Sequence, residues 1–507
     1  MRYGFLIDQH RCIGCHACTV ACKEEHNIPL GVNRTWVKYV EKGVYPDTRR
    51  HFAVLRCNHC DDAPCIEICP TVALFRRGDG IVDFDNERCI GCQSCMQACP
   101  YDALYIDPDR NTAAKCNFNA SRIEMGYKPA CEVVCPTQAI LSGDLDDANS
   151  TISKRIAMEK VSVRKAEKGT KPKLFYAGVD GDLLNPTMME PQESHFWADK
   201  APGEDLYALK MRDGERSTPG AAREVYDVPH ETPWGKKIAS YLWTKSISAG
   251  VLLLSALFLH MGFDQDAGVL SLVSPMVSLI FLAATMVILV IDLKKPGRCF
   301  YLLTKPNLNS WLVLGGYVLT VFGVLLAVWL ALILTGHGLH PVLLWATATF
   351  AVASAGYSAF LFAQARGRDF WQSPMLFWHL LIQAIAAGAA TLTLVGSLLG
   401  VSLPLFSWLG HLLVISLCLS LAMIFGELLM KHGAEDAARA GELLIRGPLM
   451  KSFWICVVGL GSIVPIVLVL WPISSLLPNI AAALLALFGL WMYEHLWIRA
   501  GQAVPLS

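Results

Sequence analysis

The second half of this 507-residue sequence has little charge and almost no cysteine. Residues 239–507 contain 12 of the 43 lysines and arginines and three of the 18 cysteines. No glycine-rich phosphate loop or nucleotide-binding fingerprint occurs, so we do not expect a nucleotide-dependent enzyme. The net charge of +0 gives no reason to expect a nucleic-acid partner. The N-terminus has neither a signal peptide nor a twin-arginine motif, which favours a cytoplasmic location for the first part of the chain.

Fifteen cysteines lie between Cys12 and Cys135, and many recur at three-residue spacings. The stretch "RCIGCHACTVACK" at 11–23 returns almost unchanged as "RCIGCQSCMQACP" at 88–100, which indicates an internal repeat. A C-x2-C-x2-C run can place three thiolates on one iron–sulfur cube, while the next cysteine reaches a neighbouring cube. Structural zinc usually uses separated C-x2-C pairs and is the weaker alternative.

The cysteines form four groups along the chain. They are Cys12, Cys15, Cys18 and Cys22; Cys57, Cys60, Cys65 and Cys69; Cys89, Cys92, Cys95 and Cys99; and Cys116, Cys131 and Cys135. Short alternating runs such as "HFAVLRC" and "GIVDFD" predict strands around the ligand loops. We therefore predict an α+β double ferredoxin-like cluster domain over residues 1–145, held together mainly by its metal centres.

Four groups in this order, with Pro70, Pro100 and Pro136 after the closing cysteines, resemble the four-cluster electron-transfer subunits of the dimethyl sulfoxide, polysulfide and nitrate reductase type. In that family the first group pairs with the fourth and the second with the third. The resemblance implies four ligand sets: Cys12, Cys15, Cys18 and Cys135; Cys57, Cys60, Cys65 and Cys99; Cys89, Cys92, Cys95 and Cys69; and Cys22, Cys116 and Cys131 together with position 119. The first of these cubes would face the partner, followed by the position-119 cube and the Cys57 cube, and the Cys89 cube would face the quinone.

Asn119 occupies a position where this family has a cysteine. Three thiolates can hold a [3Fe-4S] core, or a [4Fe-4S] cube whose fourth iron takes water or the carboxamide oxygen of Asn119. Loss of a thiolate should also raise the reduction potential of the cluster. We expect a cluster to be present there; the alternatives are a degraded site and a substitution without functional meaning.

Residues 146–235 are rich in proline, glycine and charge, which predicts an irregular connector, either a clamp around the cluster domain or a partner, or a plain linker. From about residue 236 onward the sequence predicts an all-α transmembrane bundle of eight helices, since each apolar run exceeds the roughly 20 residues that cross a bilayer. The predicted spans are 239–263, 270–293, 310–335, 341–365, 374–400, 404–430, 449–472 and 476–498.

Basic residues mark one side of this membrane domain, 236–507. The loops on the opposite side carry no lysine or arginine. The basic residues lie in the loops after spans two, four and six, and they are Lys294, Lys295, Arg298, Lys305, Arg366, Arg368, Lys431, Arg439, Arg446 and Lys451. The positive-inside rule makes this side cytoplasmic. The cluster domain enters span one from the same side, so we expect a multi-pass protein of the bacterial inner membrane with that domain in the cytoplasm.

The stretches "YLWTKSISAG", "DLKKPGRCFYLLTKPNLNSW" and "FWQSPMLFWHLLIQAIAAG" resemble the NrfD/polysulfide reductase membrane-subunit family. The resemblance implies exchange with menaquinone or ubiquinone, without haem, beside the last cluster. Polar groups inside a bilayer are candidates for such a site, and we select Lys245, Asp292, Asn309 and His379. Singly, each also has a structural explanation; for example, Lys245 could snorkel to the headgroups with Asp292 as its counter-ion. The less favoured alternative is a pair of b-type haems on His260, His379, His411 and His495.

The sequence thus predicts an electron-transfer and membrane-anchor subunit that links a molybdenum or tungsten bis-pterin enzyme to membrane quinone. The competing hypothesis is a proton-translocating redox module coupled to a soluble donor, with Asp264, Asp266, Glu427 and Glu494 as its path. A redox sensor or structural anchor fits four clusters in series less well.

Overall fold

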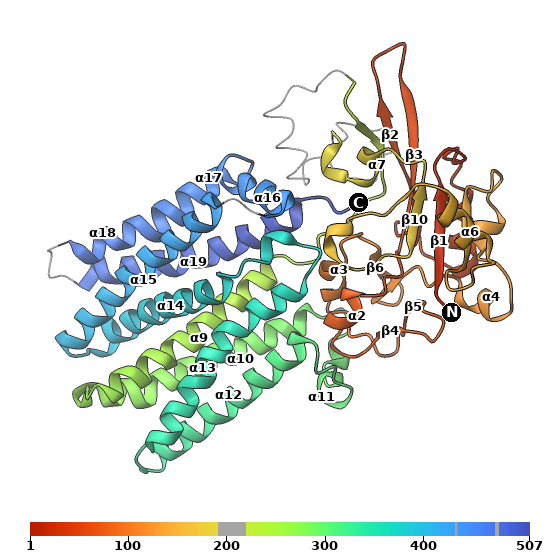
Figure 1. Cartoon of the computed structure of the whole chain (residues 1–507). Coiled ribbons are helices and arrows are strands. Elements are labelled where there is room, and N and C mark those ends of the chain that lie inside the picture. Colours follow the sequence, from red (N-terminus) through yellow and green to blue (C-terminus); the bar gives the residue numbers. More distant parts are fainter. Residues whose placement is uncertain (191–219, 431–432, 472–475) are drawn as a thin grey trace.

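The computed structural model describes residues 1–190, 220–430, 433–471 and 476–507. Figure 1 shows a strand-rich region, formed mainly by the N-terminal part of the chain, at one end of an elongated helix bundle. These correspond to the predicted ferredoxin-like region and to the predicted transmembrane bundle, so the fold class is confirmed.

The strand-rich region is built on two sheets and two hairpins. The first sheet has the order β8-β1-β10-β9, in which β1 (Tyr3–Asp8) pairs antiparallel with β8 (Ile140–Asp144) and parallel with β10 (Leu174–Ala177), and β9 is Val161–Ser162. The second sheet and the hairpins comprise β11 (Arg223–Tyr226), β2 (Thr35–Lys42) and β3 (Arg49–Arg56); β4 (Leu74–Arg76) and β5 (Val82–Phe84); and β6 (Leu104–Asp107) and β7 (Thr112–Lys115).

Short helices follow the cysteine loops. They are α1 (Ala17–His26), α2 (Pro64–Ile68), α3 (Ser94–Ala98), α4 (Ala120–Glu124) and α5 (Ala130–Val133), with α6 (Thr151–Met158) and α7 (Gly181–Leu184) further along the chain. α2 and α3 end at once because Pro70 and Pro100 follow the closing cysteines, and the residue before a proline avoids the helical conformation. α1 has no such proline and continues to His26.

The described part of the predicted connector wraps around the strand-rich region. β9 and β10 complete the first sheet, and β11 pairs with β2. The strands of this segment therefore belong to the two sheets of the strand-rich region. Residues 191–219 of the predicted connector lie outside the described residues.

Among the described residues, the bundle contains eight helices long and apolar enough to cross a membrane, which confirms the predicted number. Their bounds are α9 (Lys236–His260), the π-helical turn Val269–Val273 with α10 (Ser274–Asp292), α12 (Trp311–Leu334), α13 (Pro341–Gln364), α14 (Leu376–Leu399), α15 (Leu403–Leu429), a seventh span from Met450 to Leu470 and α19 (Leu476–Ala503). The seventh span consists of α17 (Met450–Ser452), a π-helical segment Phe453–Ile463 and α18 (Val464–Leu470). The shorter helices α11 (Tyr301–Thr304) and α16 (Glu435–Ile445) lie in loops.

α9 is the most buried of the eight spans, and it packs against α10, α13, α14 and α19. Gly250 of α9 and Gly388 of α14 touch backbone to backbone, so a Cβ atom at either position would collide with the other helix. Small residues allow helices in a membrane to approach this closely. The close crossing fixes α9 at the centre of the bundle.

The basic loops of the bundle meet the strand-rich region. Lys294 and Lys295 donate their backbone N–H groups to the carbonyl oxygens of Gly91 (3.2 Å) and Ile90 (3.1 Å). Arg366 forms an ion pair with Glu67 at 3.0 Å. The positively charged end of the bundle is therefore the end that carries the strand-rich region. Lys431 of the predicted basic set lies outside the described residues.

Residues 504–507, beyond α19, return to the strand-rich region and are largely buried there. Arg164 donates to the carbonyl oxygen of Leu506 (2.8 Å), and Lys38 donates to that of Ser507 (3.0 Å). Both basic side chains are almost fully buried. The two parts of the protein are thus joined through this segment as well as through the loops.

Candidate iron–sulfur and membrane sites

Cysteines from different groups of the sequence lie close together in the structure. One cavity is lined by Cys69, Cys89, Cys92 and Cys95. It lies where the second repeat meets the bundle, because Arg298 donates to the carbonyl oxygen of Cys89 at 3.1 Å. Four thiols around one enclosed space suit a cube, since each thiolate binds a different iron.

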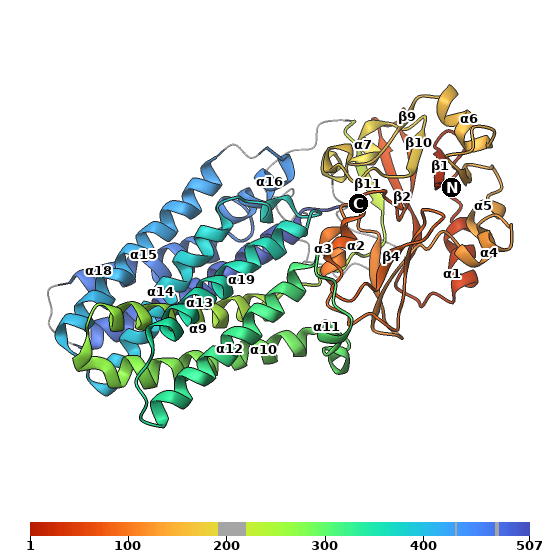
Figure 2. The same cartoon turned by 60° about the horizontal axis from the view of Figure 1, so that its bottom comes forward.

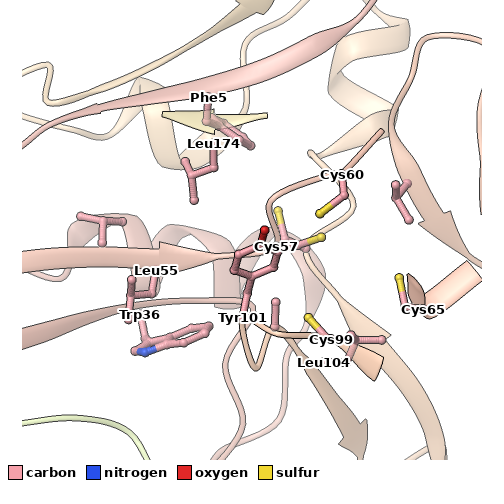
Figure 3. Packing of buried hydrophobic residues seen from close by; sticks show 14 of the residues in the cluster. Phe5, Trp36, Leu55, Cys57, Cys60, Cys65, Cys99, Tyr101, Leu104 and Leu174 are labelled. Carbon is pink, nitrogen blue, oxygen red and sulfur yellow. The ribbon is translucent and has the colours of Figure 1, made fainter. Parts of the chain in front are cut away.

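A second set surrounds a buried position in the centre of the strand-rich region. Figure 3 shows the side chains of Cys57, Cys60, Cys65 and Cys99 gathered near Tyr101. Burial raises the pKa of Cys60 to about 12, and neighbouring Cys57 and Cys99 act in the same direction. Because burial and neighbouring thiolates raise the pKa, these thiols remain ionised only if a positively charged group, such as the irons of a cluster, binds among them.

The position-119 set lines the other cavity. The cavity is lined by Cys22, Cys116, Cys131 and Asn119, and His26 also lines it. Asn119 is almost fully buried and has left-handed backbone angles (φ 57°, ψ 49°), and its Nδ2 donates to Glu25 Oε1 at 3.2 Å. Three thiols and one carboxamide therefore line this cavity, whereas four thiols line the cavity at Cys89.

The remaining set contains Cys12, Cys15, Cys18 and Cys135. Cys12 interacts electrostatically with Cys135 and Cys15, and Cys18 with Cys12. Cys15 is exposed, unlike its counterpart Cys92 in the second repeat. Figure 2 shows that α1, α4 and α5 lie together at the end of the strand-rich region away from the bundle.

Neighbouring sets lie within electrostatic reach of one another. Cys18 of the first set interacts with Cys131 of the position-119 set. Cys116 of that set interacts with Cys57, and Cys95 beside the bundle interacts with Cys65. These contacts order the four sets in a series from the exposed end to the bundle.

Buried polar atoms around the thiols support the presence of bound groups. Arg56 is completely buried and donates Nη1 to Cys131 Sγ at 3.1 Å, yet its Nε and Nη2 have no partner among the described residues. Burial alone would lower its pKa, but the charges of Cys131 and Cys116 raise it. Thr35 Oγ1, beside the position-119 cavity, also has no partner there. A cluster with exposed sulfides would accept hydrogen bonds from these orphan donors.

Backbone N–H groups already point at several thiols. Ala139 N lies 3.2 Å from Cys135 Sγ, and Gly91 N and Ala113 N each lie 3.4 Å from Cys89 Sγ. Such hydrogen bonds stabilise cluster thiolates. Over residues 1–190, 220–430, 433–471 and 476–507, no group of three His, Cys, Asp or Glu side chains is placed to hold a single metal ion.

Inside the bundle, Lys245 is completely buried. Its ammonium group donates to Ser358 Oγ (2.6 Å) and to the carbonyl oxygen of Ala355 (3.1 Å), and lies 4.7 Å from the centre of the Tyr357 ring. It also interacts electrostatically with buried Glu494 of α19. The site therefore combines an ammonium group, hydroxyl groups and a carboxyl group within the membrane region.

His379 belongs to the same polar interior. Its Nε2 lies 3.3 Å from Ser420 Oγ and 3.4 Å from Gln383 Nε2, and its ring centre lies 5.1 Å from that of Tyr493. Tyr493 precedes Glu494 on α19. α19 therefore connects the surroundings of His379 with those of Lys245.

Asp292 and Asn309 have partners at one end of the bundle. Asp292 lies 3.7 Å from Lys237, whereas the carboxyl group that interacts electrostatically with Lys245 is that of Glu494. Asn309 is exposed, and its carbonyl oxygen accepts from Gln364 Nε2 at 2.6 Å. Both residues lie at the end of the bundle next to the strand-rich region.

The other histidines considered for haem have different neighbours. The ring of His260 lies 5.1 Å from Trp345, His495 stacks on Trp491 at 5.5 Å, and His411 is exposed with its Nδ1 2.7 Å from the carbonyl oxygen of Ser407.

Among the acids of the proton-path hypothesis, two are buried within helices and one has a structural role. Asp266 accepts from Ser402 N (2.8 Å) and Ser402 Oγ (2.5 Å), and so ties the turn after α9 to the start of α15. Asp264 is exposed in the same turn. Glu427 and Glu494 are both buried.

Sequence reasoning missed three contributors to these sites. Arg56 and His26 beside the position-119 cavity were not selected, and neither was Asn307, whose Nδ2 donates to the carbonyl oxygen of Cys69 at 2.8 Å. His26 carries a readable signal, because it lies four residues after Cys22 and so on the same face of α1. Burial lowers the pKa of His26 to about 4, which leaves its imidazole neutral at physiological pH.

Comparison with known proteins finds one family in each part of the chain. Residues 49–145 match the family described as a 4Fe-4S dicluster domain, and residues 224–505 match the family described as polysulphide reductase, NrfD. The first part of the chain is 43% identical over 195 residues to a subunit of tetrathionate reductase from Salmonella typhimurium, covering 38% of this chain and 78% of the relative. It is 42% identical over 179 residues to a chain of polysulfide reductase from Wolinella succinogenes, covering 34% and 93%. It is 45% identical over 150 residues to the thiosulfate reductase electron transfer subunit PhsB of Salmonella typhi, covering 29% and 78%.

Proposed function

Because the chain belongs to the polysulphide reductase NrfD family and carries a fused 4Fe-4S electron-transfer subunit, we propose that it links a molybdenum or tungsten bis-pterin enzyme to membrane quinone. When bound, four iron–sulfur clusters supply one-electron carriers between the two. The observation that carries the proposal is the series of four cysteine sets from the exposed Cys15 to the interface at Cys69 and Cys89.

The ligands of the clusters are proposed as the four sets gathered by the fold: Cys12, Cys15, Cys18 and Cys135; Cys22, Cys116 and Cys131 in the position-119 cavity, with Asn119 beside them; Cys57, Cys60, Cys65 and Cys99; and Cys69, Cys89, Cys92 and Cys95. Arg56 balances the negative charge of the position-119 set. The backbone N–H groups at Ala139, Gly91 and Ala113 hold the thiolates in place.

The catalytic partner binds at the exposed end. This end carries large apolar residues that are each more than half exposed, namely Ile13, Val20, Met125, Tyr127 and Val133. Exposed apolar groups around a redox centre are typical of a protein–protein contact surface. The relatives named above are subunits of reductases, which supports a catalytic subunit as the occupant.

Quinone binds at the other end, in the polar interior around Lys245 and His379. The Lys245 ammonium and the Tyr357 and Ser358 hydroxyls can donate hydrogen bonds to quinone carbonyl oxygens. Glu494 supplies a proton-accepting group next to them. Asp292 and Asn309 lie nearer the interface and would line the entrance.

The orientation follows from the basic loops. Because Lys294, Lys295 and Arg366 contact the strand-rich region, the positive-inside rule supports a cytoplasmic position for that region. The protein is accordingly a multi-pass protein of the bacterial inner membrane. The catalytic partner is therefore cytoplasmic too.

A test uses the full-length protein, purified anaerobically and placed in liposomes that contain a menaquinol or ubiquinol. We expect quinol to bleach the visible absorption of the clusters, and Lys245→Met to slow this at least about tenfold while iron content stays unchanged. Mass spectrometry and metal analysis of the co-purified material should find a molybdenum or tungsten protein. Iron-free protein, or clusters that quinol does not reduce, would overturn the proposal.

A second candidate is the proton-translocating module, and the observation in its favour is that Lys245 and Glu494 are both buried and interact electrostatically. Turnover in sealed vesicles would then acidify or alkalinise the lumen. Glu494→Gln would abolish the gradient while cluster reduction by quinol continued.

A further inference from the structure

The position-119 cavity holds a possible iron ligand besides its three cysteines. His26 lines the cavity together with Cys22, Cys116, Cys131 and Asn119. No other histidine lines either cysteine cavity of the described chain. The family pattern has no place for this side chain among the ligands, because the pattern counts cysteines alone.

The local fold explains why His26 reaches the site. Cys22 and His26 are four residues apart on α1, so both side chains lie on one face of that helix. The other closing cysteines, such as Cys69 and Cys99, are followed by a proline that ends the helix. Cys22 is followed by Lys23, and the additional helical turn carries His26 to the cavity.

Asn119 is a poor candidate for the fourth ligand. Its Nδ2 donates to Glu25 Oε1, and Glu25 in turn lies 3.5 Å from Arg122, so the carboxamide is part of a polar network at the edge of the site. An amide oxygen is also a ligand that suits magnesium or calcium better than iron, whereas imidazole suits iron. The side chain of His26 lines the cavity, and no hydrogen bond of its ring is found among the described residues.

We propose that His26 supplies the fourth ligand of the position-119 cluster, which makes it a three-cysteine, one-histidine [4Fe-4S] cube. A ring nitrogen replaces the missing thiolate and binds the iron that Asn119 does not hold. A neutral imidazole in place of an anionic thiolate raises the reduction potential, as histidine ligands do in other iron–sulfur centres. The inference rests on the proposed function only in requiring that the site contains a cluster.

The test is pulsed electron paramagnetic resonance of the dithionite-reduced, full-length protein, grown with either natural or ¹⁵N-labelled histidine. We expect one cluster to show a coupling to a directly bound nitrogen that changes with the label. His26→Gln should remove this coupling and produce a [3Fe-4S] signal on oxidation. The matched control is His51→Gln on β3, which lines neither cavity and should keep the coupling.

Asn119→Cys provides a second variant if His26→Gln does not fold. It restores four thiolates, and we expect it to lose the nitrogen coupling and to lower the midpoint potential of this cluster. Four intact clusters without any histidine coupling, or a coupling that survives His26→Gln, would overturn the assignment of His26 alone. Protein without iron would instead overturn the proposed function.

Discussion

The two copies of the "RCIGC" motif have nearly the same sequence and opposite surroundings. Gly14 and Gly91 occupy equivalent positions with similar positive φ angles (70° and 69°). A Cβ atom at Gly14 would collide with Phe52 of the same region, whereas one at Gly91 would lie 2.6 Å from Lys294 Cβ of the membrane bundle. The two copies therefore share the conformation of this loop, and residues outside the repeat decide whether the loop packs within the strand-rich region or against the membrane bundle.

The copies also differ in the residues directly after them. Lys23 lets α1 continue for a further turn, while Pro100 ends the helical segment of the second copy. The short second copy leaves Gln97 free to bond with Arg368 (3.0 Å) and Gln502 (2.7 Å) of the bundle. The longer first copy places His26 in a cavity.

The largest expected effect comes from removing equivalent ligands. Cys92→Ala should abolish quinol-dependent reduction of all clusters, because the cluster nearest the bundle is lost. Cys15→Ala should leave that reduction intact and block electron transfer to the catalytic partner. Rapid-mixing absorption measurements distinguish the two, and equal loss of quinol-dependent reduction in both variants would contradict the opposite roles of the copies.

A smaller effect is expected from the exposed apolar surface of the first copy. The double variant Val20→Asp, Val133→Asp should weaken partner binding by about 2–3 kcal/mol, or roughly 100-fold, because two carboxylates would be buried without partners. Val44→Asp, in the β2–β3 turn, is the matched control because Val44 is similarly exposed. Affinity is measured by titration of the isolated partner, and iron content should be normal in all variants. Unchanged affinity of the double variant would remove this surface from the proposed interface.

Much of this division was predictable from the sequence. The spacing of the cysteines and the length of the apolar segments are local features of the sequence. They sufficed to predict the ferredoxin-like region and the eight spans. The strands at 161–162, 174–177 and 223–226 were not predicted, because their pairing depends on distant partners such as β1 and β2. The electrostatic interaction between Lys245 and Glu494 involves helices that are far apart in the sequence, and no local pattern reveals it.

The pH dependence of the unfolding temperature tests an ion pair next to the second copy of the motif. His230 lies 2.7 Å from Asp102, just after the second copy, and 3.6 Å from Asp227. Burial alone would lower its pKa, but these carboxylates raise it to about 10. The stabilisation is therefore full below the ordinary pKa of 6.5 and is lost as the pH rises towards 10. The unfolding temperature in detergent should fall over this range, and His230→Gln should flatten the slope; an unchanged slope would contradict the assignment.

The smallest effect is expected at Arg298. Its Nη1 donates to the carbonyl oxygens of Asn86 (2.6 Å) and Cys89 (3.1 Å). Arg298→Lys loses the forked geometry and should cost about 1 kcal/mol of stability at the interface. Arg110→Lys, in the exposed β6–β7 turn, should cost nothing measurable. Chemical denaturation monitored by cluster absorption checks both, and equal midpoints for the two variants would show that the fork contributes nothing.

The buried segment 504–507 has a consequence for how the molecule is made. The ribosome produces Leu506 and Ser507 after every membrane helix, yet their carbonyl oxygens complete the surroundings of Arg164 and Lys38 in the earlier part of the chain. Arg164 and Lys38 therefore lack these two acceptors until translation of the helices has finished, although Lys38 already has ion pairs with Glu224 and Asp227. Folding of the strand-rich region is therefore completed only after the helices of the membrane bundle have been synthesised.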